Sequence, residues 1–301
     1  MSSKQRTAED WHRHDLQLIK SYRPIDDDFM RELFRNNLPL TQLVLRIITG
    51  IKDLELIHEE TQYDLKRLLG SRSLWLDVLG IDSAGRVYNF EIQRNDKGAA
   101  PKRARYHSST LDVEFLNSGK DFETLPISYV IFITENDVLG DNELIYEIDR
   151  TIKKSGKPFN DDSHIIFVNG AYDNPNDNSE LAKLVHDFRC TNADDMYIEE
   201  LANRTRHFKE TPEGVSEMCK KIEDMRKEVA EAAKKEGVEI GTLKTLFDLV
   251  KKGLLTISQA AAQANMTVSE FESKLAQVCM PTQEPQLHGV STAPRHINNR
   301  T

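Results

Sequence analysis

Two acidic residues, Asp77 and Glu91, lie on either side of a short polar loop in the stretch 73–93. Apolar runs flank that loop, and Gly85 ends it, a pattern typical of a β-hairpin. A three-residue loop over 83–85 sets the register so that the two acids oppose each other. Cross-strand partners have Cβ atoms about 4.5–5.5 Å apart. The sequence therefore predicts two carboxylates facing each other, an arrangement that a one-residue slip in register would destroy.

Opposed carboxylates repel each other, so this hairpin needs a compensating positive charge. Mg²⁺ prefers carboxylate, carbonyl and water oxygens, and Asp77, Glu91 and the backbone carbonyl of Ile92 could supply three of them. A bound cation lowers the pKa of a water and offsets phosphate charge, as phosphodiester hydrolysis requires. Gln93 shares a face with Glu91, where it could position the attacking water. In the alternative interpretation, a neighbouring arginine such as Arg72 neutralises an inactive acidic pair.

A run of basic residues directly follows the hairpin, and it predicts a track for DNA phosphates. The alternative is a solvent-exposed helix face of ordinary charge density that binds nothing. The basic residues are Arg94, Lys97, Lys102, Arg103 and Arg105, to which Lys66, Arg67 and Arg72 could add.

The surrounding elements alternate between strand and helix patterns. After the acidic cluster Asp26–Asp28, we expect helices at 29–34 and 39–50, a strand from Leu54, the hairpin 73–93, a helix at 99–117, a strand at 127–134, a helix at 141–152, a strand at 164–168, and helices at 179–188 and 194–208. Strands interleaved with helices and apolar on both faces indicate an α/β domain with a covered sheet.

The chain divides by composition into five stretches. They are a polar N-terminal segment (1–24), the α/β domain (25–210), a long amphipathic helix (211–240) that Gly237 and Gly241 interrupt, a small helical unit (241–280) and a disordered tail (281–301). Within the helical unit, residues 256–271 resemble a helix-turn-helix with Ser258 as the first cap. Because its second helix carries one basic residue, a helical cap or oligomerisation element is the favoured interpretation, and a DNA-binding helix is the alternative.

Composition limits the classes of protein that remain. The 301 residues carry 40 Lys+Arg and 49 Asp+Glu, a net charge of −9, so any nucleic-acid surface must be local. No apolar run reaches the roughly 18 residues of a membrane span. The three cysteines are far apart and provide neither a disulfide framework nor a CxxC zinc site. His186 and Cys190 could supply two metal ligands, but no second pair of ligands accompanies them. We expect a soluble, cytoplasmic protein that does not bind membranes.

The spacing Asp77…Glu91-x-Gln93 resembles the signature of the PD-(D/E)XK nuclease superfamily. More narrowly, it is similar to the recombination-promoting nuclease and transposase family, in which glutamine replaces the usual motif lysine. Asp27-x-x-Met30-Arg31-x-x-Phe34 is similar to that family's opening motif, with methionine and arginine at its first Phe and Lys positions. Later positions agree, and the resemblance covers about residues 24–235.

The resemblance implies a restriction-endonuclease-like αβββαβ core with a C-terminal helical extension, and metal-dependent DNA cleavage. It implies catalytic roles for Asp77, Glu91 and Gln93, with Mg²⁺ (or Mn²⁺) as cofactor, and Asp27 as an accessory acid. Without the motif lysine, the cation must come from Arg94, Lys97 or Arg31. DNA is the expected partner, and homodimerisation is an option. The alternative function is a weak or inactive nuclease fold that acts as a DNA-binding or protein-interaction module.

Overall fold

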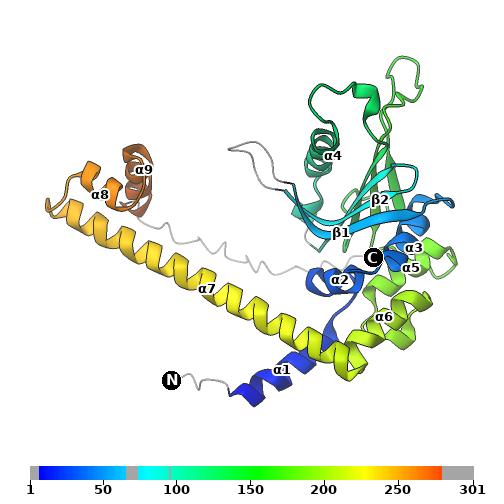
Figure 1. The fold of residues 1–301 in the computed structure, drawn as a ribbon, viewed down its shortest axis with the longest axis horizontal. Helices are drawn as coiled ribbons and strands as arrows, with labels where there is room; N and C mark the ends of the chain where they lie inside the picture. Colours follow the sequence, from blue (N-terminus) through cyan, green and yellow to red (C-terminus); the bar gives the residue numbers. More distant parts are fainter. Residues whose placement is uncertain (1–6, 66–73, 95, 280–301) are drawn as a thin grey trace, which may run out of the picture. The chain divides into compact units, whose positions relative to one another are not determined.

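A computed structural model describes residues 7–65, 74–94 and 96–279 (Figure 1). Its first compact unit runs to Glu223 and its second begins at Asp224. The elements of the first unit are α1 (Ala8–Ser21), α2 (Asp27–Phe34), α3 (Leu38–Thr49), β1 (Leu56–Leu65), β2 (Leu74–Asp82), β3 (Val87–Gln93), η1 (Asp96–Ala99), α4 (Pro101–Phe115), η2 (Phe122–Thr124), β4 (Ser128–Thr134), β5 (Ile145–Ile148), β6 (Ser163–Asn169), α5 (Glu180–Arg189), η3 (Ala193–Asp195), α6 (Glu199–Glu210) and the start of α7 (Pro212–Lys251).

Within the described residues, the strands form a six-stranded mixed sheet in the order β1-β2-β3-β4-β6-β5. β1, β2 and β3 form an antiparallel meander, whereas β3, β4 and β6 run parallel and β5 adds antiparallel at the edge. The succession α3-β1-β2-β3-α4-β4 is the expected αβββαβ core. The predicted α/β fold class with a helical C-terminal extension is therefore confirmed.

Helices cover both faces of the central strands, so β3 and β4 are buried on both sides, as parallel strands usually are. On one face, Phe34 of α2 packs edge-on against Phe90 at a centroid distance of 5.0 Å. On the other, Leu111 of α4 joins a cluster with Val130 and Phe132. Because strand side chains alternate, Glu91 lies on the α4 face, directly beside Phe132 of β4.

The hairpin loop has the predicted register. Asp82 donates its backbone N–H to the Arg86 carbonyl at 3.1 Å, and Gly85 has the positive φ of 80° that its place in the loop requires. The fully buried Asp82 carboxylate accepts hydrogen bonds from the Arg86 guanidinium at 2.6 Å and the Tyr88 hydroxyl at 2.9 Å. A satisfied buried carboxylate thus holds the loop at the length that sets Asp77 opposite Glu91.

Two segments differ from the sequence-based expectation. The sequence predicts no helix in residues 1–24, yet α1 forms behind a capping box in which Thr7 and Asp10 bond reciprocally. The predicted helix at 141–152 is wrong. Residues 145–148 form strand β5 instead, because they pair with the exposed edge of β6.

The predicted interruption of the long helix is also wrong, since α7 continues through Gly237 and Gly241. A single glycine weakens a helix by only about 1 kcal/mol, which neighbouring turns can absorb. In the second unit, α8 (Ile257–Gln263) and α9 (Val268–Cys279) follow the end of α7. Thr256, rather than Ser258, caps α8. The core of this unit is formed by Leu246, Phe247, Ala260, Ala261 and Phe271.

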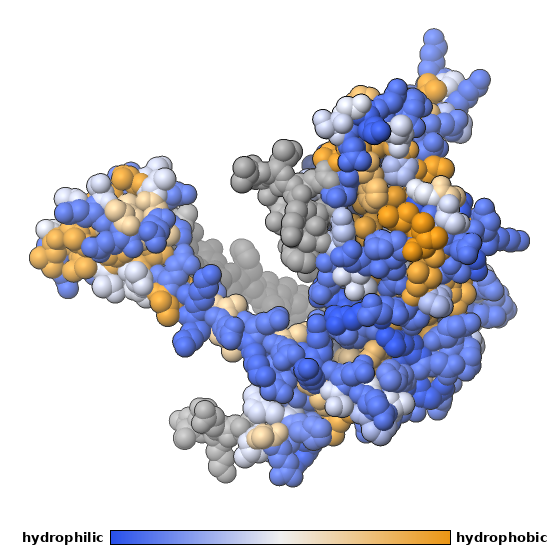
Figure 2. Space-filling view, viewed as in Figure 1, coloured by the Kyte–Doolittle hydropathy of each residue, from blue (hydrophilic) through white to orange (hydrophobic). Residues whose placement is uncertain are grey.

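The face of the protein shown in Figure 2 is mainly hydrophilic, with scattered hydrophobic areas. Among the described residues, no helix has the length and apolar character needed to span a bilayer. The predicted tail 281–301, and Lys66, Arg67 and Arg72, lie outside the described residues.

Candidate active site at the β2–β3 hairpin

The two acids meet at the point where the backbone ladder between β2 and β3 stops. The ladder pairs Val78 with Phe90, and the next pair along is Asp77 and Glu91. There, the Asp77 N–H donates to Glu91 Oε1 at 3.2 Å, and the Ile92 N–H donates to Asp77 Oδ2 at 3.1 Å. One oxygen of each carboxylate therefore accepts a hydrogen bond from a backbone N–H of the opposite strand. Asp77 Oδ1 and Glu91 Oε2 accept no such backbone bond.

Both carboxyl groups lie in a poorly solvated position. Glu91 is only 1% exposed. Burial, reinforced by the negative charge of Asp77, raises the pKa of Glu91 to about 8. Burial also raises the pKa of Asp77, against the opposing effects of Arg31 and the Ile92 N–H. Since desolvation and mutual repulsion both disfavour ionisation, the fully ionised pair requires a nearby cation.

Two guanidinium groups approach the oxygens that the backbone leaves free. Arg31 Nη2 of α2 lies 3.5 Å from Asp77 Oδ1. Arg103 Nη2 of α4 lies 3.6 Å from Glu91 Oε2. Both separations are longer than a hydrogen bond, and the two arginine side chains are 30% and 38% exposed. Two partly exposed arginine side chains thus offset the charge of the acidic pair.

His107 of α4 is a part of the site that the sequence analysis missed. Its ring is fully buried, with Nδ1 3.6 Å from Glu91 Oε1 and Nε2 accepting a hydrogen bond from Arg103 Nε at 3.2 Å. Burial and the Arg103 charge lower the pKa of His107 to about 3, so the ring is neutral. The one available signal was its i,i+4 spacing from Arg103, which places both on one helix face. The spacing alone does not say which face covers β3.

Gln93 ends β3 on the same side of the strand as Glu91, as the alternation predicts. Its Oε1 lies so close to Gly98 of η1 that a Cβ built there would be 1.9 Å away. The Ile92 N–H points toward β2, where it donates to Asp77. Because the N–H and the carbonyl of a strand residue point to the same side, the Ile92 carbonyl also points toward β2. Lys97 lies in η1, and its side chain is outside the described part.

The accessory residues separate into two groups. Asp27 lies near the site. Burial and, after it, the negative charge of the neighbouring Asp77 raise the pKa of Asp27. Arg94 instead pairs with Asp26 at 3.1 Å and with Glu135 at 3.0 Å. Arg23 bridges the same two acids, at 3.0 and 2.8 Å. Arg94 is therefore committed to a separate ion-pair network.

The predicted phosphate track begins at the first turn of α4. Lys102 and Arg105 are exposed there, while Arg103 turns into the site. This turn contains no acidic residue, and the N-cap, Ala100, offers no side-chain hydrogen bond. Basic side chains at a helix N-terminus oppose the helix dipole, so an anion placed there would relieve an unfavourable arrangement.

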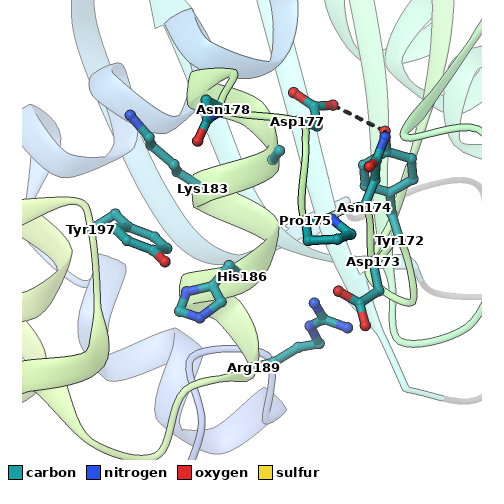
Figure 3. Close-up of a pocket in the computed structure, with 11 residues that line it drawn as sticks. Tyr172, Asp173, Asn174, Pro175, Asp177, Asn178, Lys183, His186, Arg189 and Tyr197 are labelled. Atoms are coloured by element: carbon teal, nitrogen blue, oxygen red, sulfur yellow. Dashed lines mark hydrogen bonds between the residues drawn. The ribbon is translucent and has the colours of Figure 1, made fainter.

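A second cluster of potential ligands lies on α5, beside a cavity of about 170 Å³ (Figure 3). His186, Asp187 and Cys190 are the one group of that kind among the described residues. The Asp187 carboxylate is already used, since it accepts the N–H groups of Tyr197 and Ile198 at the start of α6. Cys190 Sγ lies 3.6 Å from His186 Nδ1. The cluster is explained as a cap that joins α5 to α6.

The αβββαβ core and the paired carboxylates at the end of β2 and β3 define a nuclease-fold protein. The family model of PD-(D/E)XK nuclease family transposases matches residues 36–252, and the chain belongs to that family. Asp77, Glu91, Gln93 and Arg103 lie inside the match, whereas Asp27 and Arg31 precede it. No curated protein and no solved structure matches the chain.

Proposed function

We propose that the protein is a metal-dependent DNA endonuclease of the mobile-element, recombination-promoting type. The observation that carries the proposal is the crossed pair of carboxylates. Asp77 and Glu91 each accept a hydrogen bond from the opposite strand through one oxygen, and the other oxygen of each faces an arginine guanidinium group. Membership of the nuclease family transposases supports phosphodiesters as the substrate class.

The residues present fit a hard divalent cation such as Mg²⁺, or Mn²⁺ in its place. The donors are carboxylate oxygens, which these ions prefer, and the buried acidic pair gains from added positive charge. Asp77, Glu91 and the Ile92 carbonyl would hold the ion. When bound, it supplies Lewis acidity that lowers the pKa of a water and offsets the phosphate charge.

The remaining residues bind and orient the substrate. Lys102 and Arg105 hold phosphates that flank the scissile one, and the Gln93 amide orients the attacking water by hydrogen bonding. A new P–O bond forms from that water, and the bond to the deoxyribose oxygen breaks. The water's proton leaves to solvent, while the departing oxygen takes a proton from another water. The products are a 5′- or 3′-phosphate end and a free hydroxyl.

Replacement of each acid by its amide tests the proposal. We expect Asp77→Asn and Glu91→Gln each to lower Mg²⁺-dependent nicking of supercoiled plasmid by at least about 1,000-fold, because transition-state charge loses its counter-ion. Melting temperature should not fall, since each amide removes buried repulsion. Glu55→Gln, at an exposed acid far from the pair in sequence, is the matched control. Full nicking by either purified active-site variant would refute the proposal.

A second candidate function follows from the uncharged Gln93 at the motif lysine position. In that case, the fold binds DNA or a protein partner without turnover. It predicts salt-sensitive DNA binding, no cleavage with Mg²⁺ or Mn²⁺, and no rise in melting temperature when either ion is added.

A further inference from the structure

The missing motif lysine leaves the site in need of a positive charge that can reach the scissile phosphate. Gln93 cannot supply it. Among the described residues, Arg31, Arg94 and Arg103 stand near the end of β3, and their contacts differ in a way that singles out one of them.

Arg94 and Arg31 are both occupied by acids. Arg94 is held by Asp26 and Glu135 through bonds of 3.1 and 3.0 Å. Arg31 lies between Asp77 and Asp28, 3.5 and 3.9 Å away, and its charge is also felt by Asp27. Arg31 therefore faces two acids, Asp77 and Asp28, whereas Arg103 faces, within the described part of the chain, Glu91 alone.

Arg103 is held differently, by a neutral group. Its Nε–H donates to His107 Nε2 at 3.2 Å, which leaves the two terminal nitrogens free, and Nη2 points toward Glu91 at 3.6 Å. The Arg103 side chain is 38% exposed, and Lys102 and Arg105, which lie close to it in the sequence of α4, are exposed. One buried contact thus aims the guanidinium at the space between the acidic pair and the basic turn of α4.

The tautomer of His107 follows from its partners. A neutral imidazole has one N–H and one acceptor nitrogen, and Nε2 is the acceptor for Arg103. The hydrogen is then on Nδ1, which lies 3.6 Å from Glu91 Oε1. The Asn89 amide nitrogen lies 3.0 Å from the same ring nitrogen, and Asn89 also hydrogen-bonds Glu91. Asn89, His107 and Arg103 form a chain of contacts that fixes the guanidinium.

We propose that Arg103 is the catalytic cation of this site and that His107 is its positioning residue. This inference rests on the proposed nuclease function. In the structure without a divalent ion, Arg103 faces the Glu91 carboxyl group. Once the carboxylate has that ion as its counter-charge, the guanidinium contacts a non-bridging oxygen of the scissile phosphate, where it stabilises the charge that develops in the transition state. A cation from α4 thereby takes the place of the lysine from β3.

Plasmid nicking separates this role from simple DNA binding. Arg103→Ala should lower kcat by about 100-fold with little change in KM, as expected for a lost transition-state contact. Arg105→Ala, two residues along the same helix, should mainly raise KM and reduce its salt dependence. Added guanidinium chloride should partly restore the Arg103→Ala rate but not that of Arg105→Ala, with NaCl at equal ionic strength as the control. Equal kcat losses in the two variants, or no rescue, would overturn the assignment.

Mn²⁺ binding tests the contact with Glu91 independently of cleavage. Because a competing positive charge is removed, Arg103→Ala should lower the Kd for Mn²⁺ by about 5-fold, whereas Arg105→Ala should not change it. An unchanged Kd in Arg103→Ala would overturn the inference even in a protein that cleaves. If the wild-type protein neither binds Mn²⁺ nor nicks DNA, the proposed function itself fails, and this inference fails with it.

His107 is tested by a conservative pair of replacements. His107→Leu removes the acceptor and should reproduce the kcat loss of Arg103→Ala, without adding to it in the double variant. His107→Gln keeps an acceptor near the Nε2 position and should recover most of the rate. If His107→Leu and Arg103→Ala lower kcat by independent, multiplying factors, His107 does not act through Arg103.

Discussion

Gln93 and Gly98 illustrate how one missing side chain shapes the site. An alanine Cβ at residue 98 would lie 1.9 Å from Gln93 Oε1, at the far end of a flexible side chain. We therefore expect Gly98→Ala to displace the Gln93 amide at little cost in stability and to lower nicking by about 10-fold, as loss of an orienting group does. The measurements are the nicking rate and the melting temperature.

The matched control for that experiment is Gly237→Ala. Gly237 is helical, and a Cβ added there meets nothing within 4 Å, so the rate should not change. In a Gln93→Ala background, Gly98→Ala should have no further effect, because the side chain through which it acts is gone. An undiminished effect in that background would show that residue 98 acts in another way.

At this scale, local geometry was predictable and packing was not. Loop length and strand alternation were enough to predict that Asp77 faces Glu91, because both follow from backbone periodicity. The roles proposed for these residues remain predictions. The positions of Arg103 and His107 could not be predicted, since they depend on which face of α4 covers β3. Arg103 was interpreted only as part of the phosphate track.

Glu59 of β1 faces α3 and the Arg204 side chain of α6. Burial raises the pKa of Glu59 to about 7, against the opposing effects of Thr41, the Asn37 backbone and the Arg204 charge. An acid whose folded pKa is raised contributes stability that is complete below its unfolded pKa near 4.5 and is lost as pH rises through 7. The charged form at neutral pH therefore weakens the packing of β1 on α3.

Replacement by glutamine should remove this dependence on pH. The stability of wild type relative to Glu59→Gln should fall by about 1 kcal/mol between pH 5 and pH 8, a magnitude reduced for partial exposure. Urea unfolding of both proteins at the two pH values measures it. A difference that is constant with pH, or that grows as pH rises, would contradict the assignment.

At the level of elements, strong apolar patterns were predicted correctly, and tertiary pairing explains the failures. The hairpin, α4, β4, β6 and α5 lie where the periodicity places them. Segment 141–152 has apolar residues at helical spacing, yet Ile145 and Ile148 pair with β6. An exposed strand edge is not visible in the local pattern that it overrides. α1 was missed because most of its residues are polar, and its N-terminal signal is limited to the capping box of Thr7 and Asp10.

Across the whole molecule, charge is uneven in a way that suits a polyanionic substrate. The chain has a net charge of −9, yet every charged residue in the first turn of α4 is basic. Steering of DNA would therefore be local, and its strength should fall steeply with salt. Composition predicts the sign of the total charge, but only the fold places Arg103 of this basic turn beside Glu91.

The second unit has a small core of its own, which makes it separately sensitive to mutation. Phe271 is fully buried in α9, where it packs against Phe247 at a centroid distance of 4.9 Å. Removal of such a ring costs about 3–5 kcal/mol, and a unit this small has little stability to spare. Phe271→Ala should therefore unfold α8 and α9 selectively. Hydrogen exchange should show lost protection there and unchanged protection in β3 and β4.

Plasmid nicking by Phe271→Ala then shows what the second unit contributes. Every residue assigned to the active site precedes Glu223, so the rate per folded first unit should be retained if the unit only caps the end of α7. Val268→Ala, at an exposed position at the start of α9, controls for substitution in the same helix. Loss of nicking with intact protection in the sheet would instead indicate that α8 and α9 take part in DNA binding or self-association, as their resemblance to a helix-turn-helix allows.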